Sequence, residues 1–419
     1  MRAQHPASTP SLALVLLLLA PTPLLGCGGD DDAAGVDAGP VAVDSGPPTG
    51  DAAPPPADGG GGTDAGGRTD AGPPPPCMPD PTLERGDPIA TPAGEWTFVE
   101  FPESRCMNGS STGIGVSLNP DSDSVVIYLE GGGACFDVWT CGSVAHSGGF
   151  NAATFASIAS GGGNRGIFDR TNASNPVADW NFVFVPYCTG DVHAGNNPMG
   201  PSGRMHVGYA NVGEYLKRLV PTFEGSGKVL LTGSSAGGFG AAWNYHRTQQ
   251  AFGCTPVYLL DDAGPPLSDA YMKPCLQGLW RDLWNLNATT PPECTDCIGS
   301  DGGGISNYLS FIAQRYPERR LGLLSTMADR TIRGFFGYGY SPSCTTPAGM
   351  PSAEFEAGLL ELRDEITAPY DNFATYYVEG TAHTFLGRQL STVDENGTNL
   401  GDWIGQMISD DPAWTDVGP

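Results

Sequence analysis

Basic residues are scarce in this chain of 419 residues. It contains 20 lysines and arginines against 46 aspartates and glutamates, which gives a formal net charge of −26 at pH 7. A protein this acidic is repelled by nucleic acid and by anionic membrane surfaces. We therefore expect no nucleic-acid partner, and the charge gives no reason to expect a polyanionic substrate.

The first apolar run lacks the length of a membrane span. It extends from Leu12 to Ala20, after Arg2 and before Leu24-Leu25-Gly26-Cys27. This order of a basic residue, an apolar run and a Leu-Leu-Gly-Cys box resembles the signal peptides of bacterial lipoproteins. Residues 1–26 are thus predicted to be a signal peptide removed before Cys27, whose sulfur would carry a lipid that anchors the chain to a membrane. Because Gly28 rather than Asp follows, we expect an outer-membrane or cell-surface location. The alternatives are ordinary cleavage with a free Cys27, or no processing.

Large apolar side chains are almost absent from residues 28 to 76, which consist mainly of Gly, Ala, Asp, Pro and Thr. Such a segment cannot bury enough surface to offset the entropy of ordering it, so residues 27–76 are predicted to be a lipidated cysteine followed by a disordered tether. The tether contributes −8 and Arg2 contributes +1 to the charge of −26, which leaves −19 for the predicted body, residues 77–419.

Ten cysteines remain after Cys27, and an even number in an exported protein favours disulfide bonds, at most five here. Local pairing such as Cys135 with Cys141 is compatible with the sequence, which does not determine the connectivity. Cys294-x-x-Cys297 lacks a second pair at the spacing of a zinc ribbon, so we predict a structural role for it and no metal site.

Apolar runs with strand character alternate with amphipathic helical segments along the body. The predicted strands are residues 124–130, 181–188, 228–233, 256–262, 321–328 and 374–380, and the predicted helices are residues 212–219, 239–250, 305–316, 354–366 and 403–408. This alternation predicts an α/β fold with a mostly parallel sheet flanked by helices and chemistry at the carboxyl ends of the strands. Residues 263–304 interrupt it and hold two tryptophans and three cysteines, which predicts a cap; the alternative is a long surface excursion.

The segment Val229 to Gly240 has the pattern of a nucleophile elbow. A short apolar run is followed by Gly233-Ser234-Ser235-Ala236-Gly237 and by small residues that open a helix. A sharp turn would place the Ser235 hydroxyl at the top of the sheet, and glycines lack the Cβ atoms that would clash there. A chance match is the alternative, since the chain has 60 glycines. The strand before the motif and the helix after it favour Ser235 as a nucleophile.

A serine nucleophile needs a base, and the base needs an acid that fixes its tautomer. In the α/β-hydrolase order both follow the serine, which leaves His246 and His383 among the six histidines. His246 lies on the helix after the elbow, which carries its side chain away from the hydroxyl. His383 follows the last predicted strand at the correct end of the sheet and is the predicted base, with a capping or packing histidine as the alternative.

Asp329 follows the strand 321–328 and is the predicted acid. A helix N-cap is the alternative role for this residue, and Asp262, which ends the strand after the elbow, is the alternative acid.

Oxyanion donors are expected from two backbone turns. The N–H of Ala236 follows the nucleophile at a helix N-terminus, and Gly132 and Gly133 follow the strand 124–130. We therefore predict the N–H groups of Gly132, Gly133 and Ala236 as donors. A phosphate-binding loop is the alternative for the glycines, but no Lys-Ser/Thr follows them.

Four motifs together resemble the pectin acetylesterase family, which includes the animal Notum carboxylesterases. They are Leu129 to Cys135, Pro186 to Asp191, Gly233 to Gly238 and Asp262 to Gly264, and the similarity extends from about Val125 to the end of the chain. The resemblance implies an α/β-hydrolase-like fold, metal-free ester hydrolysis, a triad of Ser235, Asp329 and His383, and an oxyanion hole of Gly132, Gly133 and Ala236. Members commonly carry Trp within or just after the glycines, where this chain has Gly133 and Ala134.

The sequence thus predicts a surface-tethered, monomeric serine esterase that needs no cofactor and removes acetyl groups from an extracellular polysaccharide such as pectin. One alternative keeps the mechanism and changes the substrate to a lipid, a polyester or an acylated protein. Another is a tethered pseudo-hydrolase that binds carbohydrate without hydrolysing it, against which the intact triad candidates argue.

Overall fold

The computed structural model describes residues 80–162 and 164–419. The predicted signal peptide, Cys27 and the predicted tether lie outside the described residues and stay predictions. Within the described part of the chain, no helix has both the length and the apolar character needed to cross a membrane.

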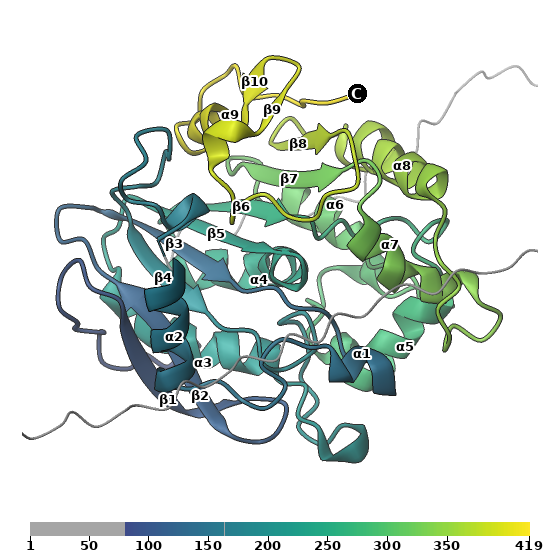
Figure 1. The fold of residues 1–419 in the computed structure, drawn as a ribbon, viewed down its shortest axis with the longest axis horizontal. Coiled ribbons are helices and arrows are strands. Elements are labelled where there is room, and N and C mark those ends of the chain that lie inside the picture. Colours follow the sequence, from purple (N-terminus) through teal and green to yellow (C-terminus); the bar gives the residue numbers. More distant parts are fainter. Residues whose placement is uncertain (1–79, 163) are drawn as a thin grey trace, which may run out of the picture. The chain divides into compact units, whose positions relative to one another are not determined.

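An eight-stranded sheet forms the centre of the described body (Figure 1), with the strand order β1-β2-β4-β3-β5-β6-β7-β8. Strand β2 is antiparallel to both of its neighbours, and every other pair is parallel. The strands are β1 (Thr97–Arg105), β2 (Ser111–Ser117), β3 (Ser124–Leu129), β4 (Asn181–Val185), β5 (Lys228–Ser234), β6 (Val257–Asp262), β7 (Leu321–Thr326) and β8 (Phe373–Val378). The mostly parallel sheet confirms the predicted α/β class.

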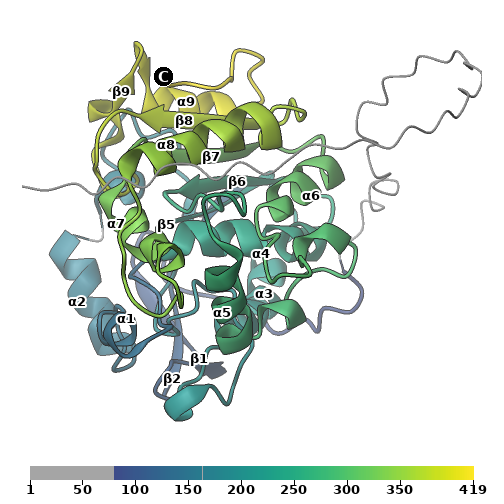
Figure 2. The same cartoon turned by 90° about the vertical axis from the view of Figure 1, so that its right-hand side faces the viewer.

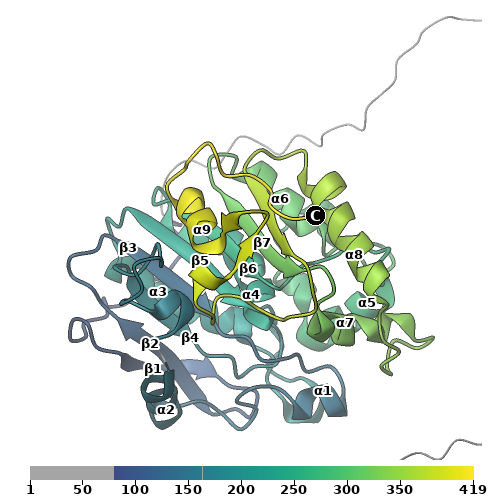
Figure 3. The ribbon, with the colours of Figure 1, turned by 45° about the horizontal axis from the view of Figure 1, so that its top comes forward.

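Helices cover both faces of this sheet. They are α1 (Val138–Gly142), α2 (Ala152–Gly162), α3 (Gly208–Thr222), α4 (Ala236–Phe252), α5 (Pro274–Trp284), α6 (Asn307–Arg315), α7 (Arg330–Phe336), α8 (Ser352–Glu361) and α9 (Leu400–Ile408). Figure 2 shows α3, α4, α5 and α6 grouped together, and Figure 3 shows α9 in front of the strands. The short strands β9 (Asp394–Glu395) and β10 (Thr398–Asn399) form a separate hairpin beside α9.

Successive residues of the central strands point to opposite faces, as the pleat requires. In β3, Val125 and Ile127 belong to the core that includes α3, α4 and α6, whereas Val126 belongs to the core that includes α9. Both faces are apolar, so these strands are continuous hydrophobic runs rather than alternating ones. This is why β3 to β8 are recognisable in the sequence.

The first two strands of the sheet were absent from the expected pattern. β1 contains Pro102 and shifts its register against β2 between Phe101 and Arg105, and β2 contains two glycines. Proline and glycine weaken a strand pattern, and a proline is tolerated only at an edge such as β1. The predicted strand 181–188 ends at Val185, because Pro186 has no N–H to continue the ladder.

Disulfide bonds in the body are of two kinds, two that join distant positions and two that close short loops. The bridges seen in the described residues are Cys106–Cys188, Cys135–Cys141, Cys275–Cys344 and Cys294–Cys297. The second and fourth confirm the local pairing and the structural role expected from the sequence. The third ties α5, which lies within the predicted cap segment 263–304, to the loop that follows α7.

Candidate active site

Ser235 occupies the turn between β5 and α4. Its backbone adopts φ 59° and ψ −121°, a conformation that a residue with a side chain rarely takes and that marks a strained turn. The turn is tight because α4 begins directly against β3: a Cβ atom on Gly237 would lie 1.9 Å from the Leu129 carbonyl oxygen. Only glycine fits there, as the elbow pattern predicts. Ser235 is 8% exposed and lies at the wall of an apolar pocket described below.

His383 and Asp329 meet at the carboxyl edge of the sheet. The Nδ1 atom of His383 lies 2.6 Å from Oδ2 of Asp329, which is fully buried, while about a fifth of the His383 side chain is exposed. The contact arises because Asp329 follows β7 and His383 follows β8, and these parallel strands are neighbours. The Thr326 hydroxyl donates to the Ala382 carbonyl at 2.6 Å and thereby fixes the residue before His383.

Asp329 is also the N-cap of α7. Its Oδ1 atom accepts the backbone N–H groups of Thr331 and Ile332 at 2.8 and 3.0 Å, so the two roles considered from the sequence coexist on one carboxylate. The cap orients the side chain and leaves Oδ2 for His383. His246, the other histidine that follows the elbow, lies on α4 and is hydrogen-bonded to the Tyr316 hydroxyl through Nδ1.

Three backbone N–H groups lie free near the elbow. Gly132 and Gly133 have φ values of 146° and 85°, which turn this backbone sharply after β3. The turn contacts the elbow directly, since a Cβ atom on Gly131 would lie 3.0 Å from Cβ of Ser235. Among the described residues, none accepts a hydrogen bond from the N–H of Gly132, Gly133 or Ala236. These donors therefore remain available for an oxyanion.

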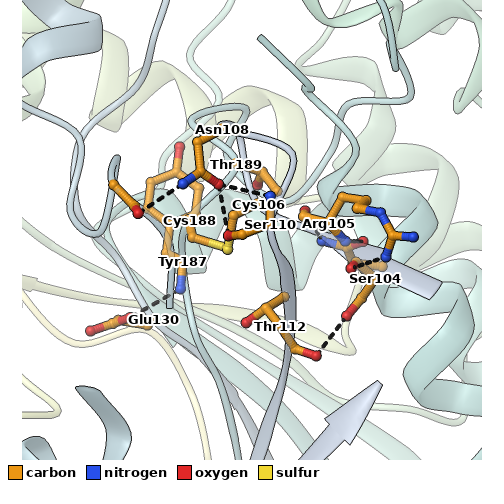
Figure 4. Close-up of a disulfide and its surroundings, with 12 residues drawn as sticks. Ser104, Arg105, Cys106, Asn108, Ser110, Thr112, Glu130, Tyr187, Cys188 and Thr189 are labelled. Carbon is orange, nitrogen blue, oxygen red and sulfur yellow. Dashed lines mark hydrogen bonds between the residues drawn. A yellow bond between two sulfur atoms is a disulfide. The ribbon is translucent and has the colours of Figure 1, made fainter. Parts of the chain in front are cut away.

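Glu130 holds this glycine turn in place, a role that the sequence pattern did not indicate. One carboxylate oxygen accepts the Tyr187 N–H at 2.9 Å (Figure 4), and the other lies 3.1 Å from Nε2 of His146. Its backbone carbonyl lies 2.8 Å from Nε2 of His193. A charged residue at the end of a buried apolar strand was the available signal, because a partly buried charge needs partners. His146 and His193, which precede Ser235 in the chain, contact Glu130 and so help to hold the glycine turn.

Asp262, the alternative acid, does not lie against Nδ1 of His383. Its carboxylate accepts hydrogen bonds from the Ser234 hydroxyl and from the backbone of Phe385 and Leu386. It thus lies beside the elbow and beside the loop that carries His383, without taking the position of Asp329.

An apolar pocket opens beside Ser235, with a cavity volume of about 70 Å³. Its wall includes Gly133, Ser235 and Ala236, which belong to the glycine turn and the elbow. The rest of the wall is almost entirely hydrophobic and comes mainly from α4, the segment 263–304, α6 and α7, with Val192 and Ala194 from the loop after β4. Its large aromatic members are Phe239, Trp243, Trp280, Trp284, Tyr308, Phe335 and Phe336. The predicted cap segment therefore forms part of the pocket.

No group of three or more His, Cys, Asp or Glu side chains in residues 80–162 and 164–419 is arranged to hold a metal ion.

Comparison with known proteins identifies the family. Residues 93–300 match the family model described as Pectinacetylesterase. Over 331 residues, the chain is 33% identical to palmitoleoyl-protein carboxylesterase notum1 of Xenopus laevis, covering 74% of this chain and 62% of that protein. The chain belongs to the pectinacetylesterase family. Palmitoleoyl-protein carboxylesterase NOTUM of Mus musculus is 29% identical over 330 residues, covering 74% of this chain and 60% of the mouse protein. The chain thus spans less than two thirds of the length of these relatives.

A solved structure has a similar fold. The structure of the Wnt deacylase Notum from Drosophila matches with a TM-score of 0.55 and 18% identity, over 77% of this chain and 95% of that chain. A likeness at this identity shows the fold, and it confirms the expected α/β-hydrolase architecture.

Proposed function

We propose that this pectinacetylesterase-family protein is a serine carboxylesterase. The observation that carries the proposal is the 2.6 Å contact between His383 and Asp329 at the edge of the sheet where the strained Ser235 turn lies. Asp329 would hold the Nδ1–H tautomer of His383, so that Nε2 accepts the Ser235 proton as the hydroxyl oxygen attacks the ester carbonyl. The acyl–enzyme forms when the C–O bond breaks and His383 returns the proton to the leaving alcohol. Water then repeats the sequence and releases the acid.

The backbone supplies the charge stabilisation in this proposal. The carbonyl oxygen becomes an oxyanion in each tetrahedral intermediate, and the free N–H groups of Gly132, Gly133 and Ala236 would bind it. One such donor lowers the barrier by roughly 3–4 kcal/mol. The donors are preorganised because Glu130 and its partners fix the glycine turn before substrate binds.

The apolar pocket supports an acyl chain longer than acetyl. An acetyl methyl would contact only a small part of this wall, whereas each methylene of a longer chain gains about 0.8 kcal/mol on burial. The relatives named palmitoleoyl-protein carboxylesterases are consistent with such a site. We therefore propose an ester with an apolar acyl chain as the substrate, in preference to the acetylated polysaccharide expected from the sequence. Deacetylation of a polysaccharide is the second candidate, favoured by the Pectinacetylesterase match over residues 93–300.

Hydrolysis of p-nitrophenyl acetate, butyrate and octanoate by the full chain tests both candidates. We expect kcat/KM to rise with chain length, and Ser235→Ala to lower kcat by at least about 10⁴-fold. A maximum on acetate would favour the polysaccharide candidate, to be followed by assays of acetate release from acetylated pectin. Folded wild-type protein without activity on any ester would contradict the esterase proposal and favour a pseudo-hydrolase.

Ala242 offers a direct test of the acyl pocket. It lies on α4, lines the pocket and is 5% exposed. Ala242→Leu fills part of the pocket and is expected to lower kcat/KM for octanoate by about 10-fold, with little change for acetate. Equal losses on both esters would contradict the placement of the acyl chain.

We also propose that the protein is exported and anchored through a lipid on Cys27. The disulfide bonds of the described body support export, because such bonds persist in oxidising compartments. Partition of the full chain, expressed in a bacterium, into a detergent phase tests the anchor. Cys27→Ala should move the protein to the aqueous phase, and an unchanged distribution would contradict the proposal.

A further inference from the structure

The carboxylate of Asp262, at the end of β6, is fully buried within a hydrogen-bond network that the proposed triad does not use. Its Oδ2 atom accepts a hydrogen bond from the Ser234 hydroxyl at 2.6 Å, and the Tyr128 hydroxyl donates to Ser234 at 3.1 Å. The carboxylate also accepts the backbone N–H of Phe385 at 2.9 Å and that of Leu386 at 3.0 Å. The network therefore reaches from the elbow to the loop just after His383.

The backbone of Asp262 makes a further contact with the elbow. Its carbonyl oxygen accepts the N–H of Ser235 at 2.6 Å, and in the register of β5 and β6 it is paired with Ser234. Asp262 thus accepts hydrogen bonds from the proposed nucleophile Ser235 and from Phe385 and Leu386 in the histidine loop. Ser235 and His383 come from loops 148 positions apart in the chain, and Asp262 connects those two loops.

We propose that Asp262 is a positioning residue that sets the separation of the Ser235 hydroxyl and the His383 imidazole, while Asp329 is the acid of the triad. This inference rests on the proposed esterase function. The physical reason is that proton transfer from the serine requires hydrogen-bond distance, and a displacement of about 1 Å costs about 10²-fold in rate. Without the Asp262 carboxylate, the N–H groups of Phe385 and Leu386 lose their buried acceptor, and the histidine loop moves to find another.

The charge of Asp262 has a second effect on the same loop. Burial raises the pKa of Asp262, and hydrogen bonds from Leu386, Ser234 and Phe385 together with the charge of His383 oppose that rise. The interaction between the two charges is mutual, so Asp262→Asn removes an attractive interaction with the imidazolium that forms during the proposed proton transfer. Neutralising residue 262 should therefore change the pH dependence of kcat/KM, whereas simple loosening of the loop should not.

Asp262→Asn tests the proposal, since the amide has nearly the same shape but no charge and one acceptor fewer. With p-nitrophenyl octanoate, or with acetate should that be the better substrate, we expect kcat to fall by about 10²-fold. KM should stay within about twofold, because the substituted residue does not line the pocket, and the acid limb of the kcat/KM profile should move to lower pH. Asp329→Asn is expected to lose about 10⁴-fold.

Asp261→Asn is the matched control. Asp261 is the neighbouring residue on β6, is 2% exposed, and its carboxyl accepts the N–H of Gly264 at 2.8 Å rather than a group of the histidine loop. Burial raises the pKa of Asp261 well above its ordinary range, so an amide resembles its protonated form. This variant should keep the acid limb in place and change kcat by less than about threefold.

The outcomes separate this inference from the proposed function. Equal hydrolysis by wild type and Ser235→Ala would remove the esterase proposal before Asp262 is considered. Where the wild type is active through Ser235, unchanged kcat and pH profile in Asp262→Asn would overturn the positioning role. A larger loss in Asp262→Asn than in Asp329→Asn would overturn it as well, because Asp262 would then be the acid.

A second variant applies if circular dichroism shows that Asp262→Asn does not fold. Ser234→Ala removes one hydrogen bond from the carboxylate and keeps the charge. We expect it to slow labelling of Ser235 by a fluorophosphonate about 10-fold with little change in Tm. An unchanged labelling rate in folded Ser234→Ala would contradict the network proposed here.

Discussion

Each oxygen of the Asp329 carboxylate has a partner of its own. Oδ2 lies against His383, and Oδ1 caps α7 through the N–H groups of Thr331 and Ile332. The proposed reaction and the fold therefore depend on different atoms of one side chain. A substitution that keeps an oxygen at the Oδ1 position therefore distinguishes the helix-capping role of Asp329 from its contact with His383.

Asp329→Asn should lower kcat by about 10⁴-fold and leave the free energy of unfolding nearly unchanged. The amide oxygen caps a helix as well as a carboxylate does, whereas the amide group cannot hold the correct imidazole tautomer. Ester hydrolysis and urea denaturation measure the two effects. Asp329→Ala is the control, expected to lose the activity and about 1 kcal/mol of stability. Activity close to wild type in Asp329→Asn would contradict the assignment of the acid.

The His146–Glu130 pair should make stability depend on pH. The hydrogen bond to Glu130 raises the pKa of His146 above its ordinary value of 6.5, against the opposing effect of burial. The folded pKa is thus higher than the unfolded one, so the stabilisation is fully present below about pH 6.5 and is lost as the pH rises through the folded pKa.

His146→Asn removes this titration and suits the backbone, since residue 146 has φ 54° and Asn tolerates positive φ. The variant should be destabilised more at pH 6 than at pH 8. The difference should be about 0.2–1 kcal/mol, because solvent screens a partly exposed pair. Urea denaturation at the two pH values measures it, and a loss independent of pH would show that the pair contributes no charge interaction.

At the scale of elements, the elbow depends on the close approach of α4 to β3. Gly237→Ala would place its Cβ 1.9 Å from the Leu129 carbonyl oxygen and force the helix and the strand apart. We expect a loss of about 1–3 kcal/mol in the free energy of unfolding, with lower activity because the oxyanion turn follows Leu129 directly. Gly278→Ala is the control: Gly278 lies inside α5, no atom lies within 4 Å of the added Cβ, and stability should rise by up to about 1 kcal/mol. Equal effects of the two substitutions would contradict the steric argument.

The elements that were recognisable from the sequence share one property. β3 to β8 are buried on both faces and are flanked by amphipathic helices such as α3 and α6, so local hydrophobicity alone indicates them. β1 and β2 were not recognised, because the proline of β1 and the glycines of β2 weaken a local strand pattern. The proline is tolerated because β1 lies at the edge of the sheet. α7 was missed because it is short, and its N-cap was the residue assigned to catalysis.

For the molecule as a whole, a disulfide bond should stabilise more when it encloses a longer loop, by an amount that grows with the logarithm of the loop length. Cys106–Cys188 joins residues 82 positions apart, from the β1–β2 hairpin to the loop after β4 (Figure 4), whereas Cys294–Cys297 joins residues three positions apart. Replacing the first pair by alanine should cost about 4.5 kcal/mol and replacing the second about 2 kcal/mol, from loop entropy in the unfolded chain. Urea denaturation under oxidising conditions measures both losses. A larger loss for Cys294–Cys297 would show that native packing dominates instead.

The pocket is a property of the whole molecule as well. Its wall combines the glycine turn, α4, the segment 263–304, α6 and α7, which are separated by up to about 200 residues in the sequence. Sequence motifs predicted an ester-cleaving site but not the apolar pocket beside it. The proposal of a longer acyl chain rests on this apolar wall.

The sequence by itself determined the α/β class, the strand–turn–helix around Ser235 and the positions of His383 and Asp329 after their strands, because hydrophobic runs, glycines and chain order are local properties. Only the tertiary structure shows how the two candidate carboxylates differ: Asp262 ends β6, whereas Asp329 follows β7 as the N-cap of α7. The position of β8 beside β7 places His383 against Asp329, and the position of β6 beside β5 leaves Asp262 bonded to the elbow. Strand adjacency depends on packing between distant segments, and local pattern does not encode it.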